Sequence, residues 1–362
     1  MKIKSLVKIS ILFSILMISI YLSLSNNYKS ETNFKEAFPD LTKSLNKIKS
    51  IKFEYDNNQY NLLRKPEGWV LEDYNYYPVD NKKINNFIWQ LVRLEFIDKK
   101  DTKPNNFNKL GLNYPLNKEL KSKRIKFYDN DKVIYDFIIG KSLKSNLNKN
   151  INYFRNFDQE QVWLFNNNLN IPLKQISWIK SDLFEIGRWR IREVTINHKK
   201  TINSFKIYRD SYSSQNYKFD KLPKDFDFIN NYSQNSLAAS FEGIKIENML
   251  PLSQFNSKEV IFNSEIKVHT FDGLVLTLKV IKIDQEEYVQ VNFKSNKLIR
   301  KELPIDGVKV VGIPKMLSFK EVEEKVKELK FVEKWLYKLD VNTMTEFKKQ
   351  RKDIIKKIKL SN

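Results

Sequence analysis

A nearly unbroken run of apolar residues lies close to the start of the chain, and everything after it is mixed or polar. Three lysines precede the run, which extends from Ile9 to Leu24 and is interrupted only by serines. A membrane-spanning helix needs about 20 mostly apolar residues, and lysines in front of it place the N-terminus in the cytoplasm. We therefore predict a basic cytoplasmic start over residues 1–8 and a single-pass transmembrane anchor over residues 9–25.

The same pattern is also typical of a cleaved secretory signal peptide. Such a signal has a basic start, an apolar centre and small residues before the cut, a place that Ser23 and Ser25 would fill here. The apolar run is long for a signal core, which favours an uncleaved anchor. With either interpretation the bulk of the chain lies outside the cytosol, in the periplasm or, in a photosynthetic source, in the thylakoid lumen.

Strand and helix patterns alternate after a polar spacer over residues 26–47. Ile51–Tyr55 and Tyr60–Arg64 are predicted to form two strands around a turn. Apolar residues then recur at helical spacing after Asp80, namely Ile84, Phe87, Ile88, Leu91 and Leu94. Further strands are predicted at Gly68–Leu71, Arg124–Tyr128, Val133–Ile139, Tyr153–Arg155 and Val162–Phe165. With a short helix near Leu173–Glu185, these elements make up a first α+β unit over residues 48–190.

From Arg192 onward the pattern begins again, which indicates an internal repeat. The helix region aligns without a gap: Phe87, Leu91, Leu94, Phe96 and Asp98 fall on Leu237, Phe241, Ile244, Ile246 and Asn248. Ser204–Tyr208 and Tyr217–Phe219 resemble Ile51–Tyr55 and Tyr60–Leu62, Ile125–Phe127 falls on Ile266–Val268, and Tyr153 falls on Tyr288. Any α+β domain alternates in this way, but the ungapped helix favours duplication. We predict a second, related α+β unit over residues 191–310.

The C-terminal segment, residues 311–362, contains two candidate capping boxes. Ser318–Glu321 and Thr343–Glu346 each place a hydroxyl three residues before a glutamate, as at the start of a helix. The first box opens an amphipathic helix, and Trp335–Leu339 follows it as a short strand. The second box is expected to open a strongly basic helix that runs to about Lys359. The fold class predicted for the exported part is therefore α+β, with helices at its C-terminal end.

The charge and cysteine content narrow the range of functions. The 362 residues include 64 Lys and Arg against 43 Asp and Glu, a net charge of +21, and no cysteine. Disulfides, thiolate metal sites and cysteine nucleophiles are therefore excluded. The charge favours an anionic partner, and an electrostatic binder of anionic lipid or polymer is one alternative function. A codon bias toward Lys, Asn, Ile, Phe and Tyr is the stronger explanation of the charge, and an exported domain is not expected to bind nucleic acid.

Residues with catalytic potential do not form any recognised motif. The two histidines, His198 and His269, have neither the spacing of a zinc site nor a nucleophile motif beside them. Gly-rich nucleotide-binding loops are absent from the sequence. Asp129 and Asp131 are typical of a hairpin turn, and Asp225 and Asp227 of a solvent-facing strand. We assign no catalytic, cofactor-binding or metal residues and expect no enzyme activity and no cofactor, with a carboxylate-based envelope hydrolase as the alternative.

Several short motifs occur in an order that resembles one family. They are Gly68–Leu71 followed by Tyr77–Asp80, Leu110–Pro115, Ile138–Gly140, Tyr153–Arg155 before Val162–Leu164, and Thr270–Leu274. Over roughly residues 48–340 the chain resembles the family catalogued as domain of unknown function 4340. The resemblance implies an uncharacterised envelope protein with one N-terminal membrane helix. Some relatives occur beside, or fused to, auxiliary parts of ABC-type export systems linked to gliding motility, which implies an envelope role. From the anchor, the duplication and the missing catalytic patterns we predict a non-enzymatic binding or accessory subunit with an envelope protein as partner and no identifiable small-molecule substrate.

Overall fold

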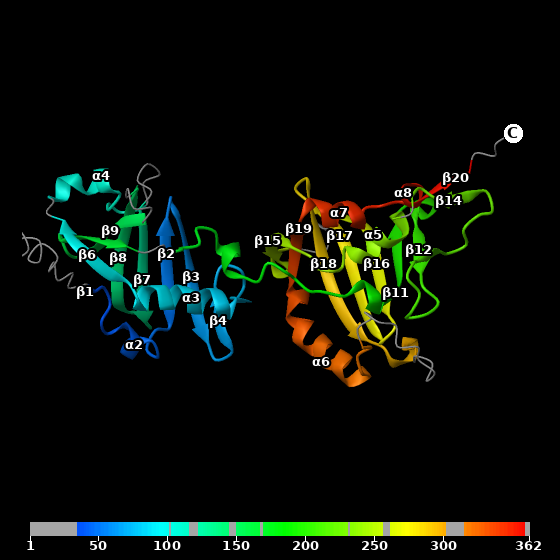
Figure 1. Ribbon diagram of the computed structural model, residues 1–362, viewed down its shortest axis with the longest axis horizontal. Helices are drawn as coiled ribbons and strands as arrows, with labels where there is room; N and C mark the ends of the chain where they lie inside the picture. Colours follow the sequence, from blue (N-terminus) through cyan, green and yellow to red (C-terminus); the bar gives the residue numbers. More distant parts are fainter. Residues whose placement is uncertain are drawn as a thin grey trace, which may run out of the picture. The chain divides into compact units, whose positions relative to one another are not determined.

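The computed structural model describes residues 35–100, 103–115, 122–144, 150–166, 169–230, 232–255, 261–301 and 315–358, which form two compact units (Figure 1). The first unit comprises the described residues up to Pro66 together with Lys82–Ile171, and the second comprises Glu67–Asn81 and the described residues from Pro172 onward. The basic start at 1–8 and the membrane segment predicted at 9–25 lie outside the described residues. Within the described part, none of the helices has both the length and the apolarity that crossing a membrane would require.

The first unit is an antiparallel sheet with the strand order β1-β6-β10-β9-β8-β7-β2-β3. Its strands span Lys35–Glu36 (β1), Ser50–Tyr55 (β2), Asn58–Lys65 (β3), Glu95–Lys100 (β6), Lys123–Asp129 (β7), Lys132–Lys144 (β8), Asn150–Asn156 (β9) and Val162–Asn166 (β10). Its helices are α2 (Leu41–Ser44), α3 (Asn81–Val92), η1 (Pro104–Asn106) and α4 (Phe107–Leu110). Residues 35–47, expected as part of a spacer, belong to this unit because Phe38 and Leu41 are buried in it.

Helix α3 packs through the apolar stripe that its sequence predicts. Ile84, Phe87 and Leu91 are buried, and the ring of Phe87 lies 5.5 Å from that of Phe53 on β2. The opposite face of the sheet is covered near α4, where Leu112 and Ile138 belong to one buried cluster. Burying apolar area on both faces of the sheet is what stabilises a unit of this size.

The second unit is also an antiparallel sheet, with the strand order β13-β12-β11-β16-β17-β18-β19-β15. Its strands span Ile191–His198 (β11), Phe205–Tyr208 (β12), Lys218–Phe219 (β13), Ile246–Pro251 (β15), Ile261–Thr270 (β16), Leu274–Ile283 (β17), Glu286–Ser295 (β18) and Trp335–Leu339 (β19). Two further strand pairs are β4 (Gly68–Leu71) with β5 (Tyr77–Pro78), and β14 (Phe226–Phe228) with β20 (Ile355–Lys357), of which only the second is a two-stranded sheet of its own.

Short helices connect these strands. The α-helices are α5 (Ser233–Ala239), α6 (Phe319–Leu329), α7 (Val341–Phe347) and α8 (Arg351–Ile354). The 3-10 helices are η2 (Gln175–Trp178), η3 (Arg188–Arg190), η4 (Thr201–Asn203), η5 (Leu252–Gln254), η6 (Lys297–Ile299) and η7 (Lys330–Lys334). Helix α6 packs beside β18, as Figure 1 shows in orange. Two large antiparallel sheets and a few short helices make this an α+β protein, as the sequence predicts.

The two sheets have the same topology. The order β3-β2-β7-β8-β9-β10-β6 of the first unit corresponds, strand by strand and in chain order, to β12-β11-β16-β17-β18-β19-β15 of the second. Counted along the paired registers, the equivalent positions include Lys126 and Lys267, Tyr153 and Tyr288, and Asp98 and Asn248. These are the equivalences of the sequence alignment. The alignment is wrong for Ser204–Tyr208, because β12 is the counterpart of β3 and not of β2.

Of two helix predictions, one is confirmed in a shorter form and one is wrong. Residues 173–185 contain the short helix η2, after which Leu183 and Ile186 donate backbone hydrogen bonds to Ile244 and Phe241 in an extended segment. At the C-terminus, Asp340 and not Thr343 caps α7, through the amides of Asn342 and Thr343. The predicted basic helix ends at Phe347 because the buried Ile354 and Ile355 lead into strand β20. The capping box of Ser318 with Glu321 is confirmed at the start of α6.

Gly140 tests the packing of the first unit, because a Cβ there would collide with the carbonyl oxygen of Leu110 and lie 3.1 Å from that of Gly111. Gly140→Ala should therefore lower the free energy of unfolding by about 2–3 kcal/mol, measured by chemical denaturation. Gly187→Ala is the matched control, since its Cβ would meet only Glu242, at 4.0 Å. Equal stability of the two variants would contradict the close approach.

Candidate functional site

The segment that leads into β11 forms one wall of a cavity in the second unit. Ile186 donates its backbone N–H to Phe241, and Arg190 donates its own to Gly187. These bonds hold the short helix η3 at the entrance to the sheet and fix where the Arg190 side chain begins. Phe184 and Ile186 are buried, so this wall is apolar on either side of Glu185.

Arg190 is held by a buried carboxylate. Its Nε donates to Asp272 Oδ2 at 2.7 Å and its Nη2 to Asp272 Oδ1 at 3.3 Å, and Asp272 is 0% exposed. The Thr270 hydroxyl donates to the same carboxylate at 2.5 Å. A two-point contact of this kind fixes the plane of a guanidinium. Arg190 is therefore oriented before any ligand binds. Its Nη1 group takes no part in the contact with Asp272 and is available to a further partner.

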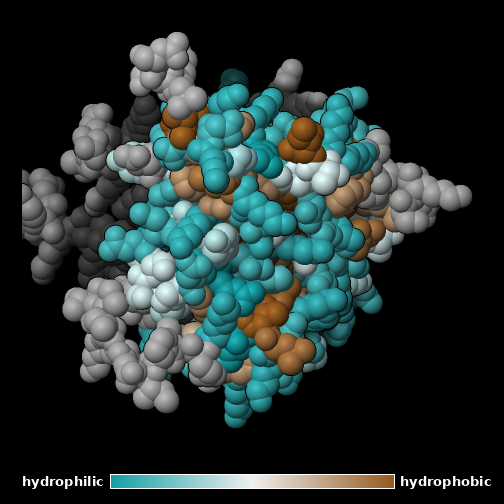
Figure 2. Space-filling view, turned by 90° about the vertical axis from the view of Figure 1, so that its right-hand side faces the viewer, coloured by the Kyte–Doolittle hydropathy of each residue, from teal (hydrophilic) through white to brown (hydrophobic). Residues whose placement is uncertain are grey.

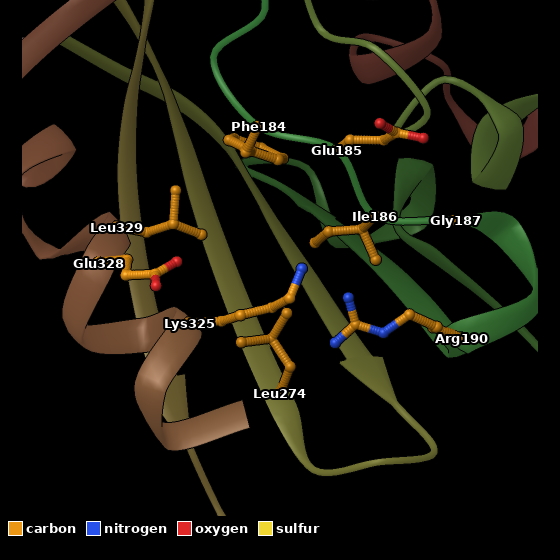
Figure 3. Close-up of a pocket in the computed structure, with 9 residues that line it drawn as sticks. All are labelled: Phe184, Glu185, Ile186, Gly187, Arg190, Leu274, Lys325, Glu328 and Leu329. Atoms are coloured by element: carbon orange, nitrogen blue, oxygen red, sulfur yellow. The ribbon is translucent and has the colours of Figure 1, made fainter. Parts of the chain in front are cut away.

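Helix α6 supplies the opposite wall. Its capping box fixes the first turn, and Val322 buries one face against the sheet. Lys325, Glu328 and Leu329 follow at helical spacing and line the cavity. Figure 3 shows the ammonium group of Lys325 pointing toward the guanidinium of Arg190, whereas the carboxylate of Glu185 is turned away from both.

The cavity between these walls has a volume of about 400 Å³. We call it the Arg190–Lys325 pocket; its apolar lining comes from Phe184, Ile186, Leu274 and Leu329. Two cations that converge beside apolar walls suit a carboxylate or another small anionic group attached to an apolar body.

The residues singled out from the sequence lie elsewhere. His198 Nε2 is 2.9 Å from the carbonyl oxygen of Lys349, and His269 Nδ1 is 2.6 Å from Glu193. The hydrogen bond to His269 lowers the pKa of Glu193. Each histidine therefore has a hydrogen-bond partner within the second unit. Among the described residues, no group of three or more His, Cys, Asp and Glu side chains is placed to hold a metal ion.

The two aspartate pairs are also explained locally. Asp129 and Asp131 lie at the β7–β8 hairpin turn, around Asn130 with a φ of 52°. Asp225 and Asp227 are exposed beside β20, where Asp225 is 3.7 Å from Lys357. The acidic residues of this edge therefore offset part of the basic charge at the C-terminal end of the chain.

The first unit has a charged cluster on the sheet face opposite α3. Glu54 is 1% exposed and lies 3.1 Å from Lys126, 3.4 Å from Lys52 and 3.7 Å from Arg124. Arg124 also donates to both carboxylate oxygens of Asp136, at 2.7 and 2.6 Å. Every cation of this cluster therefore has a carboxylate partner within the unit, which indicates a structural role.

Arg155 brings three of the short motifs together in the fold. Its guanidinium donates to the carbonyls of Leu112 and Phe157 and lies 4.5 Å from the Phe107 ring centroid. Leu112 in turn packs with Ile138 and Tyr153 in one buried cluster. The motifs at 110–115, 138–140 and 153–155 therefore meet in one place and hold the loop after α4 on the sheet.

Sequence reasoning did not single out Arg190 or Lys325. The two are 135 positions apart, and only the folded sheet brings them together. The signal that was available is the Thr270–Leu274 motif, since its Asp272 is the carboxylate that fixes Arg190.

Comparison with known proteins identifies the family. The family model described as domain of unknown function (DUF4340) matches residues 69–265. A search of the curated proteins and a search of the solved structures found no match. The matched region, more than half of the chain, holds the motifs at 110–115, 138–140 and 153–155, and the protein belongs to the DUF4340 family.

Proposed function

We propose that this protein is a single-pass, membrane-anchored and non-enzymatic binding subunit of the cell envelope. Its N-terminus lies in the cytoplasm and its bulk in the periplasm or lumen. The Arg190–Lys325 pocket holds a carboxylate of an envelope protein partner. The observation that carries the proposal is the pairing of a fixed guanidinium with a facing ammonium in an apolar-walled cavity.

One side of the second unit supports recognition through charge. Figure 2 looks onto the side of the second unit that lies on the right in Figure 1, and this side is predominantly hydrophilic, with hydrophobic residues in small separate patches. Partners of such a surface are selected by placed charges more than by apolar area. The apolar run at 9–24 supports the membrane anchor, and an auxiliary role beside an ABC-type transporter is the finer part of the proposal, which rests on the resemblance of the sequence motifs.

A carboxylate-based hydrolase is supported less well. A glycosidase needs two carboxylates that face each other across the substrate, about 5–9.5 Å apart. Glu185 and Glu328 both line the pocket, but Figure 3 shows Glu185 turned away from its centre. Glu328→Gln should leave partner binding intact if the pocket is a binding site.

Photocrosslinking in intact cells tests the proposed function. A photoreactive residue in place of Glu328, at the rim of the pocket, should give one crosslinked envelope protein. The same residue in place of the exposed Glu323, on the same helix but outside the pocket lining, is the matched control and should give none. Adding Lys325→Glu should abolish the crosslink, because it places a carboxylate where the partner's carboxylate binds. A product that forms equally at both positions, or that survives Lys325→Glu, would contradict the proposal.

A further inference from the structure

The second unit has a second cavity, on the open face of its sheet. Strands β16, β17 and β18 bury Ile266, Leu276 and Val291 on one face and present polar side chains on the other. These polar residues line a cavity of about 360 Å³. We call this surface the lysine face, defined by Lys267, Thr277, Lys279, Gln290, Asn292 and Lys294.

The three lysines of this face surround neutral hydrogen-bonding groups. The register places Thr277 between Lys267 on β16 and Asn292 on β18. Lys267 is 2.8 Å from Glu265, which also lines the cavity. Lys279 and Lys294 are exposed and make no ion pair with any other residue in the described part of the chain. Two cations of the lysine face are therefore available for an external partner.

The first unit provides an internal comparison, because its equivalent face is closed. Lys126, the counterpart of Lys267, lies 3.1 Å from the buried Glu54. Ile138, the counterpart of Lys279, is fully buried in the cluster with Leu112. This face is therefore closed by an ion pair and an apolar cluster in the first unit, whereas in the second unit an exposed lysine, Lys279, stands where Ile138 is buried. Packing of the sheet explains the buried Ile138, but it does not explain an exposed lysine at the equivalent position of the second unit.

The spacing of the lysines indicates an extended ligand with more than one charge. Neighbouring strands are about 4.8 Å apart, and alternate residues along a strand about 6.8 Å, so the three lysine Cα atoms are separated by roughly 8–14 Å. Hydroxyl and amide groups between the cations match a ligand that carries hydroxyls between its charges. We propose that the lysine face binds an acidic oligosaccharide, with its carboxylates on Lys279 and Lys294 and its hydroxyls on Thr277, Gln290 and Asn292.

This site is independent of the Arg190–Lys325 pocket. The residues that line the two cavities are entirely different, so a ligand of one does not require the other. Lys325→Gln should therefore leave oligosaccharide binding unchanged, and loss of binding at the lysine face should leave the Glu328 crosslink unchanged.

Titration of the full-length protein in non-ionic detergent with short oligogalacturonates tests the proposal. Lys279→Gln combined with Lys294→Gln should weaken binding about tenfold at low salt, because two charge-assisted contacts are lost. Lys224→Gln with Lys352→Gln removes the same charge from exposed positions outside the lysine face and should bind like the wild type. Thr277→Val should weaken binding without changing its salt dependence, since it removes a hydroxyl and no charge.

Three results would overturn the proposal. The first is equal weakening in both lysine pairs, which would indicate only the effect of net charge. The second is wild-type affinity after loss of Lys279 and Lys294. The third is binding to vesicles of phosphatidylglycerol with none to the oligogalacturonates, which would assign the face to a lipid surface.

Discussion

Arg209→Met should lower the free energy of unfolding of the second unit by about 4 kcal/mol, one of the largest effects that we expect of a single substitution. Arg209 is 2% exposed, and its guanidinium donates to the carbonyls of Ile191, Tyr212, Ser214, Arg188 and Trp189. Methionine keeps much of the apolar length but has no donor. Carbonyls left buried without a donor cost their full desolvation energy, which exceeds the net gain of the original bonds.

Thermal denaturation of the full-length protein, followed by tryptophan fluorescence, measures this effect. A loss of about 4 kcal/mol corresponds to a fall of roughly 8–16 °C in Tm for a unit of this size. Arg188→Met is the matched control, because Arg188 lies in the short helix η3 whose carbonyls Arg209 contacts, and its own guanidinium stacks 4.8 Å from the Trp189 ring centroid. The control should lose about 1 kcal/mol or less. Similar losses in the two variants would show that the carbonyl contacts of Arg209 are not the cause.

Local patterns predicted most strands of the first unit and both amphipathic helices. The stripe Ile84, Phe87 and Leu91 is buried in α3, and the Ser318 capping box begins α6, because these signals act within one or two turns of helix. The helix near residues 173–185 is limited to η2, because the segment after it pairs by backbone hydrogen bonds with Phe241 and Ile244, far along the chain. A pattern of apolar residues cannot distinguish burial in a helix from burial in a paired, extended segment.

The sequence alignment of the two units is correct in the central strands, where buried side chains fix the register, and wrong at β12, where they do not. Lys126 and Lys267 align because each lies between buried positions of a central strand. Strand β12 is short and close to the edge of its sheet, so its apolar positions carry less information, and it was matched to β2 instead of β3. Central strands constrain sequence on both faces, whereas strands near an edge constrain it weakly.

The candidate site could not be read from the sequence. Charged residues are frequent in this chain, and nothing local distinguishes Arg190 or Lys325 from the other 62 basic residues among the 64. What distinguishes them is a buried carboxylate at one and a facing helix at the other, which are properties of the fold. The same holds for the lysine face, whose cations come from three strands.

Single and double variants of the Arg190–Asp272 ion pair distinguish its contribution to stability from its contribution to binding. Arg190→Gln alone leaves the carboxylate of Asp272 buried without its cation and should cost about 3–5 kcal/mol in the free energy of unfolding. Arg190→Gln with Asp272→Asn replaces the pair by two neutral amides of similar size. The double variant should regain most of that loss, with a coupling energy of about 2 kcal/mol or more, because no buried charge is left unpaired.

The double variant should regain stability but not partner binding. The double variant is folded but has no guanidinium in the pocket, so it should lose the crosslink from position 328 while it keeps oligosaccharide binding at the lysine face. Denaturation curves of the wild type, both single variants and the double variant give the coupling energy, and crosslinking of the same four proteins gives the binding role. Additive stability losses would mean that Asp272 does not hold Arg190. A crosslink that persists in the stable double variant would mean that Arg190 orients the wall of the pocket and does not contact the partner.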